Sequence, residues 1–176
     1  VGSEMCIRDS GTAVKTPGEK IFPYIQKNLD DIITVDDDEL VVAFLDMVEN
    51  HKMVIENSGL LTVAALKHLN VKEKRVVSIL SGGNMDVITM SSVVQQGLIF
   101  RDRIFTVSVL LPDKPGELSR VADTIAKEQG NVIKLEHNQF VSINRSAAVE
   151  LRITLEAFGT DHKKQIMKAL EKNCLL

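Results

Sequence analysis

The stretch Val76-Val77-Ser78-Ile79-Leu80-Ser81-Gly82-Gly83-Asn84 decides how the first half of this chain is interpreted. Four of its first five residues are apolar, which is typical of a buried strand. The strand is expected to end in a Ser-Gly-Gly-Asn turn, with a helix over residues 86–97 after it. Ligands of open α/β sheets bind outside the carboxyl ends of the strands, so this turn predicts a small-molecule site.

The same pattern of strands and helices extends upstream of this turn. A β-branched strand is expected at 32–35, followed by a capping box formed by Asp36 and Glu39 and by an amphipathic helix to about residue 50. Residues 53–56 could form a short strand or only the approach to the next turn, and 60–69 form an apolar helix buried on most sides. Strands that alternate with helices predict a parallel sheet.

A second compact unit is expected after a polar hinge at residues 101–103. Its predicted elements are a strand at 104–111, a helix at 117–128, strands at 132–136 and 147–157, and a last helix capped by Asp161. Gly130 is expected to close the first of these helices in a left-handed conformation. The order β-α-β-β-α lacks one strand of a ferredoxin-like split βαβ unit.

Composition and charge exclude several classes of protein. The 176 residues are 44% hydrophobic and 26% charged, with a net charge of −3, which gives no basic field for nucleic acid. No apolar run reaches the roughly 20 residues that span a bilayer, and no signal peptide is apparent, so a cytoplasmic protein is expected. No pair of histidines or carboxylates has the spacing of a metal site, so no metal is predicted.

Both ends of the chain are expected to be foreign to the folded protein. Residues 1–10, VGSEMCIRDS, resemble a translated sequencing adapter, and residues 174–176 resemble a similar read-through. Cys6 and Cys174 both lie in these ends, so neither a disulfide nor a thiol nucleophile is predicted.

Residues 11–100 resemble the threonine and serine dehydratases, pyridoxal-phosphate enzymes of the tryptophan-synthase β fold (fold type II). The segments Gly11-Thr-Ala-Val-Lys15, Val54-Ile-Glu-Asn-Ser-Gly59 and Ser81-Gly-Gly-Asn84 occur in that family's order and spacing. The resemblance implies that the Ser81 hydroxyl contacts the pyridine nitrogen of pyridoxal phosphate, with Gly82, Glu56 and Gly11 beside the cofactor. A neutral hydroxyl there favours α,β-elimination over transamination.

The chain departs from this family in two respects. The Schiff-base lysine and the glycine-rich phosphate loop lie upstream in the family, and neither motif occurs here. No catalytic residue is therefore assigned in this chain, and no turnover is expected from it alone.

Residues 104–173 resemble an ACT domain, a regulatory module that binds amino acids, without its last strand. The matching segments are Asp113-Lys114-Pro115-Gly116-Glu117-Leu118 and Gly130-Asn131-Val132. The resemblance implies an effector site at Asp113, Pro115, Gly116, Glu117, Leu118 and Asn131, and a homo-oligomer, because such sites form between paired modules. A branched-chain amino acid such as isoleucine or valine is the expected effector.

These resemblances together predict the C-terminal part of a threonine ammonia-lyase, an enzyme that converts L-threonine to 2-oxobutanoate and ammonia. Two alternatives remain open at this point. One is a serine dehydratase or racemase of the same family, and the other is a non-catalytic amino-acid sensor that carries a remnant of the enzyme fold.

Overall fold

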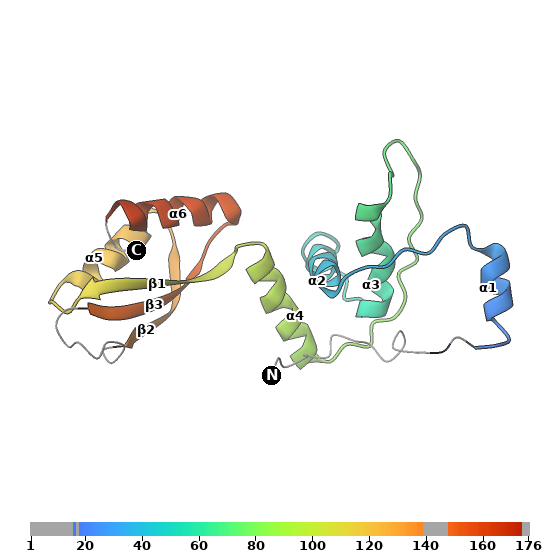
Figure 1. The fold of residues 1–176 in the computed structure, drawn as a ribbon, viewed down its shortest axis with the longest axis horizontal. Coiled ribbons are helices and arrows are strands. Elements are labelled where there is room, and N and C mark those ends of the chain that lie inside the picture. The colour runs from blue at the N-terminus through green and yellow to red at the C-terminus, as the bar shows by residue number, and fades with distance from the viewer. Residues whose placement is uncertain (1–15, 17, 139–147, 174–176) are drawn as a thin grey trace. The chain divides into compact units, whose positions relative to one another are not determined.

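The structure is a computed structural model that describes residues 16, 18–138 and 148–173. Gly11, Lys15 and both predicted foreign ends lie outside the described residues. The chain divides into two compact units, Val1–Gly97 and Leu98–Leu176. The division falls within one continuous helix, α4, which spans Val87–Phe100 (Figure 1).

The regular elements among the described residues of the first unit are all helices, joined by long irregular segments. Its elements in chain order are α1 (Phe22–Asn28), α2 (Asp37–Asp46), the π-helical turn η1 (Met47–His51), α3 (Asn57–Ala64), the 3-10 turn η2 (Ala65–His68) and α4. The predicted capping box is confirmed, since the backbone N–H of Asp36 donates to Glu39 Oε2 at 3.2 Å. The core consists of apolar side chains from α2, α3, α4 and the segment before α3: Leu40, Val41, Ala43, Phe44, Met47, Ile55, Leu60, Ala64 and Val93.

The strands predicted for this unit are not formed among its described residues. Residues 32–35, 53–56 and 76–81 form no regular element, and none of them pairs with a strand of the described sheet. Val77 is 90% exposed and Ile79 is 74% exposed, so the expected parallel sheet is absent from this part of the chain. A strand exists only through hydrogen bonds to a neighbour, and an apolar sequence cannot supply that neighbour itself.

The apolar helix also differs from the expectation for residues 60–69. It begins earlier, at Asn57, and its α-helical part ends at Ala64, where the 3-10 turn follows. Leu60 and Ala64 are fully buried, whereas Leu69 is 44% exposed. Burial is therefore confined to one side of α3, the side that faces the core.

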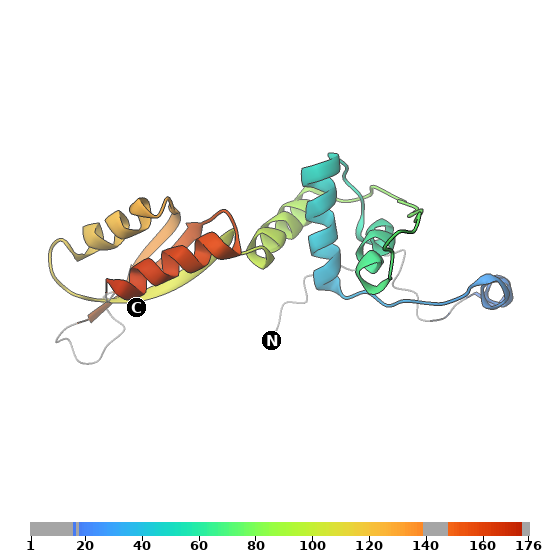
Figure 2. The same ribbon diagram turned by 90° about the horizontal axis from the view of Figure 1, so that it is seen from above.

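The second unit is a three-stranded antiparallel sheet with two helices. Its elements are β1 (Ile104–Pro112), α5 (Glu117–Lys127), β2 (Asn131–Asn138), β3 (Ala148–Glu156) and α6 (Thr160–Lys172). The sheet order is β1-β3-β2, so β3 is the central strand and β1 and β2 flank it. Both helices lie on one face of the sheet (Figures 1 and 2).

Alternating side chains build the core of this second unit. Strand β1 alternates buried and exposed residues from Phe105 onward, and β3 pairs with it antiparallel from Ile104–Glu156 to Pro112–Ala148. The core joins these strands to both helices through Phe105, Val107, Val109, Leu111, Val121, Ile125, Leu151, Ile153, Leu155, Ala157, Ile166 and Leu170. The predicted β-α-β-β-α order is therefore present.

Two predicted helix ends in this unit are wrong. Gln129, with φ 61°, takes the left-handed conformation after α5, whereas no positive φ occurs at Gly130. Gly130 is needed for space instead, because a Cβ there would lie 2.8 Å from Ile125 Cγ2. The N-cap of α6 is Gly159, and Asp161 lies in the first turn without capping it.

Candidate functional site

The Ser81–Asn84 turn lies against the beginning of α3, so two of the segments that carry the sequence resemblance are in contact. The Glu56 carboxylate lies between them. Its Oε1 accepts a hydrogen bond from the Ser58 hydroxyl at 2.9 Å, and its Oε2 accepts one from the backbone N–H of Asn84 at 3.3 Å. The backbone N–H of Glu56 donates in turn to the carbonyl of Gly82 at 3.4 Å.

Two glycines make this contact possible. Gly82 has φ +76°, and a Cβ built on it would lie 1.9 Å from Glu56 Oε1. A Cβ on Gly59 would lie 1.8 Å from the backbone oxygen of Ser81. Any side chain at either position would push the turn and the helix apart.

Ser81 is exposed, and its hydroxyl has no hydrogen-bond partner among the described residues. A hydroxyl can donate or accept, and both glycines after it carry no side chain that would cover a planar ring. This donor set fits the ring-nitrogen edge of pyridoxal phosphate. Glu56, which is predicted to lie beside the cofactor, accepts one hydrogen bond within the protein on each of its carboxylate oxygens.

The turn between β1 and α5 was the second predicted site. Gly116 has φ +95° and forms the N-cap of α5, with its carbonyl accepting from the N–H of Arg120 at 3.0 Å. A Cβ there would meet nothing within 4 Å, so the space beside this glycine is open. Asp113 and Pro115 are exposed, Leu118 is 46% exposed, and Glu117 pairs with Arg120 at 2.7 Å.

Asn131 does not join the other five predicted effector residues within this unit. It begins β2, at the opposite end of α5 from Gly116, and an 11-residue helix is about 16 Å long. Its side-chain amide donates to Glu156 Oε2 on β3 at 3.1 Å. A ligand that contacts both Gly116 and Asn131 therefore needs one of them from a second copy.

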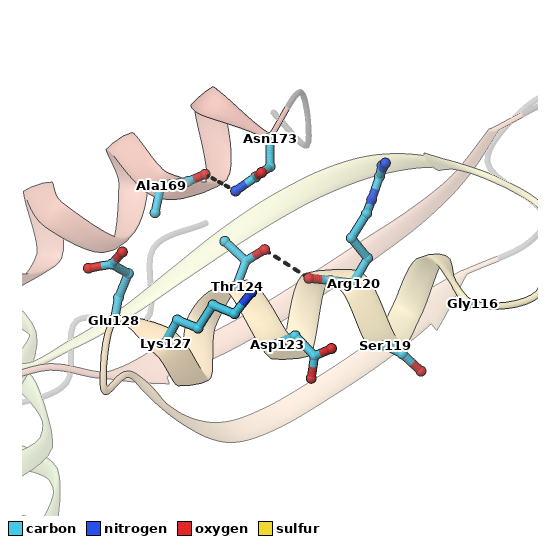
Figure 3. Close-up of a pocket in the computed structure, with 9 residues that line it drawn as sticks. All are labelled: Gly116, Ser119, Arg120, Asp123, Thr124, Lys127, Glu128, Ala169 and Asn173. Carbon is cyan, nitrogen blue, oxygen red and sulfur yellow. Dashed lines mark hydrogen bonds between the residues drawn. The ribbon is translucent and has the colours of Figure 1, made fainter.

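A groove that the sequence did not indicate runs from the beginning of α5 towards the end of α6 (Figure 3). Its volume is about 380 Å³, and its lining residues are Gly116, Ser119, Arg120, Asp123, Thr124, Lys127, Glu128, Ala169 and Asn173. Only Gly116 belongs to the predicted set. The spacing of Arg120, Asp123 and Lys127 on one polar side of α5 is a sequence signal for these residues, but only packing brings α6 beside them.

The hinge at 101–103 forms an ion pair with the first turn of α6. Asp102, at φ 54°, accepts from Lys163 Nζ at 2.6 Å and from the Thr160 hydroxyl at 2.9 Å. These hydrogen bonds, with that from Lys163 the larger, hold the pKa of the Asp102 carboxyl below its ordinary value. The hinge is thereby joined to the first turn of α6.

Two negative findings apply to the part of the chain that the structure describes. No three His, Cys, Asp or Glu side chains gather there as a metal site would require. No helix there combines the length and the apolar character that crossing a membrane needs.

Comparison with known proteins gives matches to both parts of the chain. Residues 7–82 match the family model described as pyridoxal-phosphate dependent enzyme. An L-threonine ammonia-lyase of Geobacter sulfurreducens is 34% identical over 163 residues, covering 92% of this chain, and one of Thermotoga maritima is 31% identical over 161 residues, covering 91%. A mitochondrial threonine dehydratase of Schizosaccharomyces pombe is 30% identical over 82% of this chain.

The chain spans only part of these relatives. It covers 40% of the length of each of the two bacterial proteins and 25% of the yeast protein. The alignments extend well beyond residues 7–82 and include most of the second unit.

Proposed function

We propose that this chain is part of a threonine ammonia-lyase, because residues 7–82 match the family model of pyridoxal-phosphate dependent enzymes and L-threonine ammonia-lyases match most of the chain. The whole enzyme would dehydrate and deaminate L-threonine to 2-oxobutanoate and ammonia. Residues 11–100 would supply the end of the catalytic domain, 101–103 the linker and 104–173 a regulatory domain. The chain alone would be inactive, since it has no Schiff-base lysine motif.

The observation that carries this proposal is the contact between the Ser81–Asn84 turn and the Glu56–Gly59 segment. These segments are 20 or more residues apart in the sequence, yet Gly59 has no room for a Cβ beside the Ser81 carbonyl. A Ser-Gly-Gly turn alone is a common feature, whereas this pairing leaves the Ser81 hydroxyl exposed and without a described partner.

The residues of this chain would hold one edge of the cofactor. Pyridoxal phosphate, when bound, withdraws electrons from the amino acid attached to it, and the protein tunes that property through its ring nitrogen. The Ser81 hydroxyl would hydrogen-bond that nitrogen without protonating it, and Gly82 would leave room for the ring. Gly11 is proposed to lie beside them, on the resemblance alone.

Exposed apolar surface in the first unit supports the view that more of the catalytic domain covers it. The extended segments at 32–35 and 76–80 and the first turn of α4 expose Ile32, Val77, Ile79, Val87 and Ile88 by 74% or more. Unpaired extended backbone with apolar side chains is what strands of a larger sheet would present. We propose that the remainder of the domain pairs with these segments.

The second unit is proposed to act as an ACT-like regulatory domain. Its element order and its sheet order β1-β3-β2 are those of a ferredoxin-like fold without the final strand. The separation of Gly116 from Asn131 supports an amino-acid site shared between two copies, and hence a homo-oligomer. A cytoplasmic location remains a prediction from the sequence.

The test is to express the chain together with the preceding residues of its gene and measure 2-oxobutanoate formation from L-threonine. We expect activity that depends on added pyridoxal phosphate and that falls at least tenfold in Ser81→Ala, the loss of about 1.4 kcal/mol in the transition state. Ser91→Ala, an exposed serine on α4, is the matched control and should keep full activity. Full activity in Ser81→Ala, or a preference for L-serine over L-threonine, would contradict the proposal.

Regulation is tested in the same preparation. Isoleucine or valine is expected to change the L-threonine saturation curve, and Asn131→Ala should abolish that response while leaving activity without effector intact. No response to either amino acid would remove the regulatory part of the proposal and leave the catalytic part standing.

A further inference from the structure

Glu56 lies beside the predicted cofactor edge, yet its hydrogen bonds are made to the protein. We propose that Glu56, with Ser58 and Asn84, is a positioning residue that fixes Ser81 to the beginning of α3, rather than a group that contacts the cofactor. The inference rests on the proposed function in one point, that the Ser81 hydroxyl contacts the cofactor and so needs a fixed position. We refer to Glu56, Ser58, Gly59, Gly82 and Asn84 as the α3 clamp.

The carboxylate of Glu56 already has a partner on each oxygen. Ser58 donates its hydroxyl to Oε1 at 2.9 Å and Asn84 donates its backbone N–H to Oε2 at 3.3 Å. Hydrogen bonds to a charged acceptor are stronger than those to a neutral one. Each oxygen of Glu56 therefore already holds a donor from the protein, whereas the Ser81 hydroxyl has no partner among the described residues.

Ser81 is held from both sides in the sequence. After it, the Gly82 carbonyl accepts from the Glu56 backbone N–H at 3.4 Å. Before it, the Ile79 carbonyl accepts from the Thr62 hydroxyl on α3 at 3.1 Å. Ile79 and Gly82 are therefore hydrogen-bonded to Thr62 on α3 and to Glu56, the residue just before α3.

The close approach of Gly59 fixes the spacing between turn and helix. A Cβ at this position would lie 1.8 Å from the oxygen of Ser81 and 2.9 Å from its carbonyl carbon. The backbone of Ser81 thus lies directly on the first turn of α3. Leu60, the next residue, and Ala64, one turn after Leu60, are buried in the core formed with α2, so the helix itself is anchored.

A consequence is that the position of the Ser81 hydroxyl depends on the core through α3. The turn has no strand neighbour among the described residues, and extended backbone without such a neighbour is held only by side-chain and turn contacts. The α3 clamp supplies these contacts.

The test is nuclear magnetic resonance on this chain, without cofactor, comparing wild type with Glu56→Gln. Glutamine keeps the size but has one acceptor oxygen in place of two. We expect the amide of Asn84 to exchange with solvent on the order of fivefold to tenfold faster, and the backbone signals of Ser81 and Gly82 to shift.

Asp86→Asn is the matched control. Asp86 is also a carboxylate beside the turn, and its Oδ1 accepts from the backbone N–H groups of Ile88 and Thr89 at 2.9 Å each. It should change the beginning of α4 and leave Ser81 unchanged.

A second pair of variants keeps the test decisive if Glu56→Gln does not fold. Ser58→Ala should loosen the turn as Glu56→Gln does, and Ser58→Thr, which keeps the hydroxyl, should restore it. Unchanged Ser81 and Gly82 signals in both Glu56→Gln and Ser58→Ala would overturn the inference. Because no cofactor is present, failure of the whole enzyme to use pyridoxal phosphate would be a separate result.

Discussion

Replacing Gly59 with alanine tests the central contact of the first unit. An alanine Cβ would lie 1.8 Å from the Ser81 oxygen and 2.7 Å from the buried Ile55 Cγ2. An ordinary C···O contact is about 3.3 Å, so the turn and helix must separate by roughly 1.5 Å. The obstruction is backbone, which cannot rotate away as the end of a side chain can.

The magnitude follows from three contributions. Overpacking of this kind costs about 2 kcal/mol, and loss of a hydrogen bond such as that from Glu56 to Gly82 costs about 1 kcal/mol. Replacing glycine with alanine within a helix stabilises the helix by up to about 1 kcal/mol. The net expectation is a destabilisation of the first unit by about 2 kcal/mol.

Hydrogen exchange measured by mass spectrometry, peptide by peptide, separates this loss from any change in the second unit. Peptides from α2 and α3 should exchange about 30-fold faster in Gly59→Ala, and peptides from β1 and β3 should not change. The matched control is Gly97→Ala in α4, where the nearest atom is the side-chain end of Leu45 at 3.3 Å. That variant should remain within about 0.5 kcal/mol of wild type.

Helix propensity alone predicts the opposite result for Gly59→Ala. If the variant exchanged as slowly as wild type, or more slowly, the Ser81 carbonyl would not lie against α3. The reasoning about both the candidate site and the α3 clamp would then be refuted.

Three further predictions concern the second unit and are read from its thermal unfolding. Because the pKa of Asp102 is lowered in the folded protein, its ion pair contributes fully to stability above the ordinary pKa of about 3.9, and that contribution is lost as the pH falls through the lowered pKa. Asp102→Asn should therefore cost about 1 kcal/mol at pH 7 and almost nothing at pH 2. A pH-independent cost would contradict this assignment. His162→Ala removes two ring hydrogen bonds, one from the backbone N–H of Phe158 just before α6 and one with the Glu128 carbonyl at the end of α5, and should cost about 1–3 kcal/mol; an unchanged melting temperature would show that they do not form. Gly130→Ala forces a Cβ within 2.8 Å of Ile125 Cγ2 and should cost about 1–3 kcal/mol, whereas stability equal to wild type would show that the core yields there.

Local patterns predicted the features that depend on neighbours in sequence. The capping box was predicted from spacing alone, because Asp36 and Glu39 lie three residues apart. The alternation along β3 was predicted in the same way, because successive side chains of a strand point to opposite faces of the sheet. The order of all five elements in the second unit was predicted for the same reason. The expected capping of α6 by Asp161 failed because Gly159, two residues earlier, already starts the helix.

The candidate site was predicted only in its parts. Ser81, Gly82 and Glu56 were identified from the resemblance, but the sequence does not show that the carboxylate of Glu56 bonds to Ser58 and Asn84. Nor does it show that Gly59 is required by the Ser81 carbonyl. The contacts of Glu56 with Asn84 and of Gly59 with Ser81 join residues more than 20 positions apart, and local propensity says nothing about such pairs.

The sequence by itself determined which segments of this chain are helical, which are apolar and where the turns lie, because these follow from spacing and from the conformational freedom of single residues. Only the tertiary structure decided whether an apolar segment becomes a strand. Residues 104–111 became one because β3 lies beside them, and residues 76–80 did not because no described segment pairs with them. The physical reason is that a strand is completed by the backbone hydrogen bonds of its neighbour, which its own side chains do not encode.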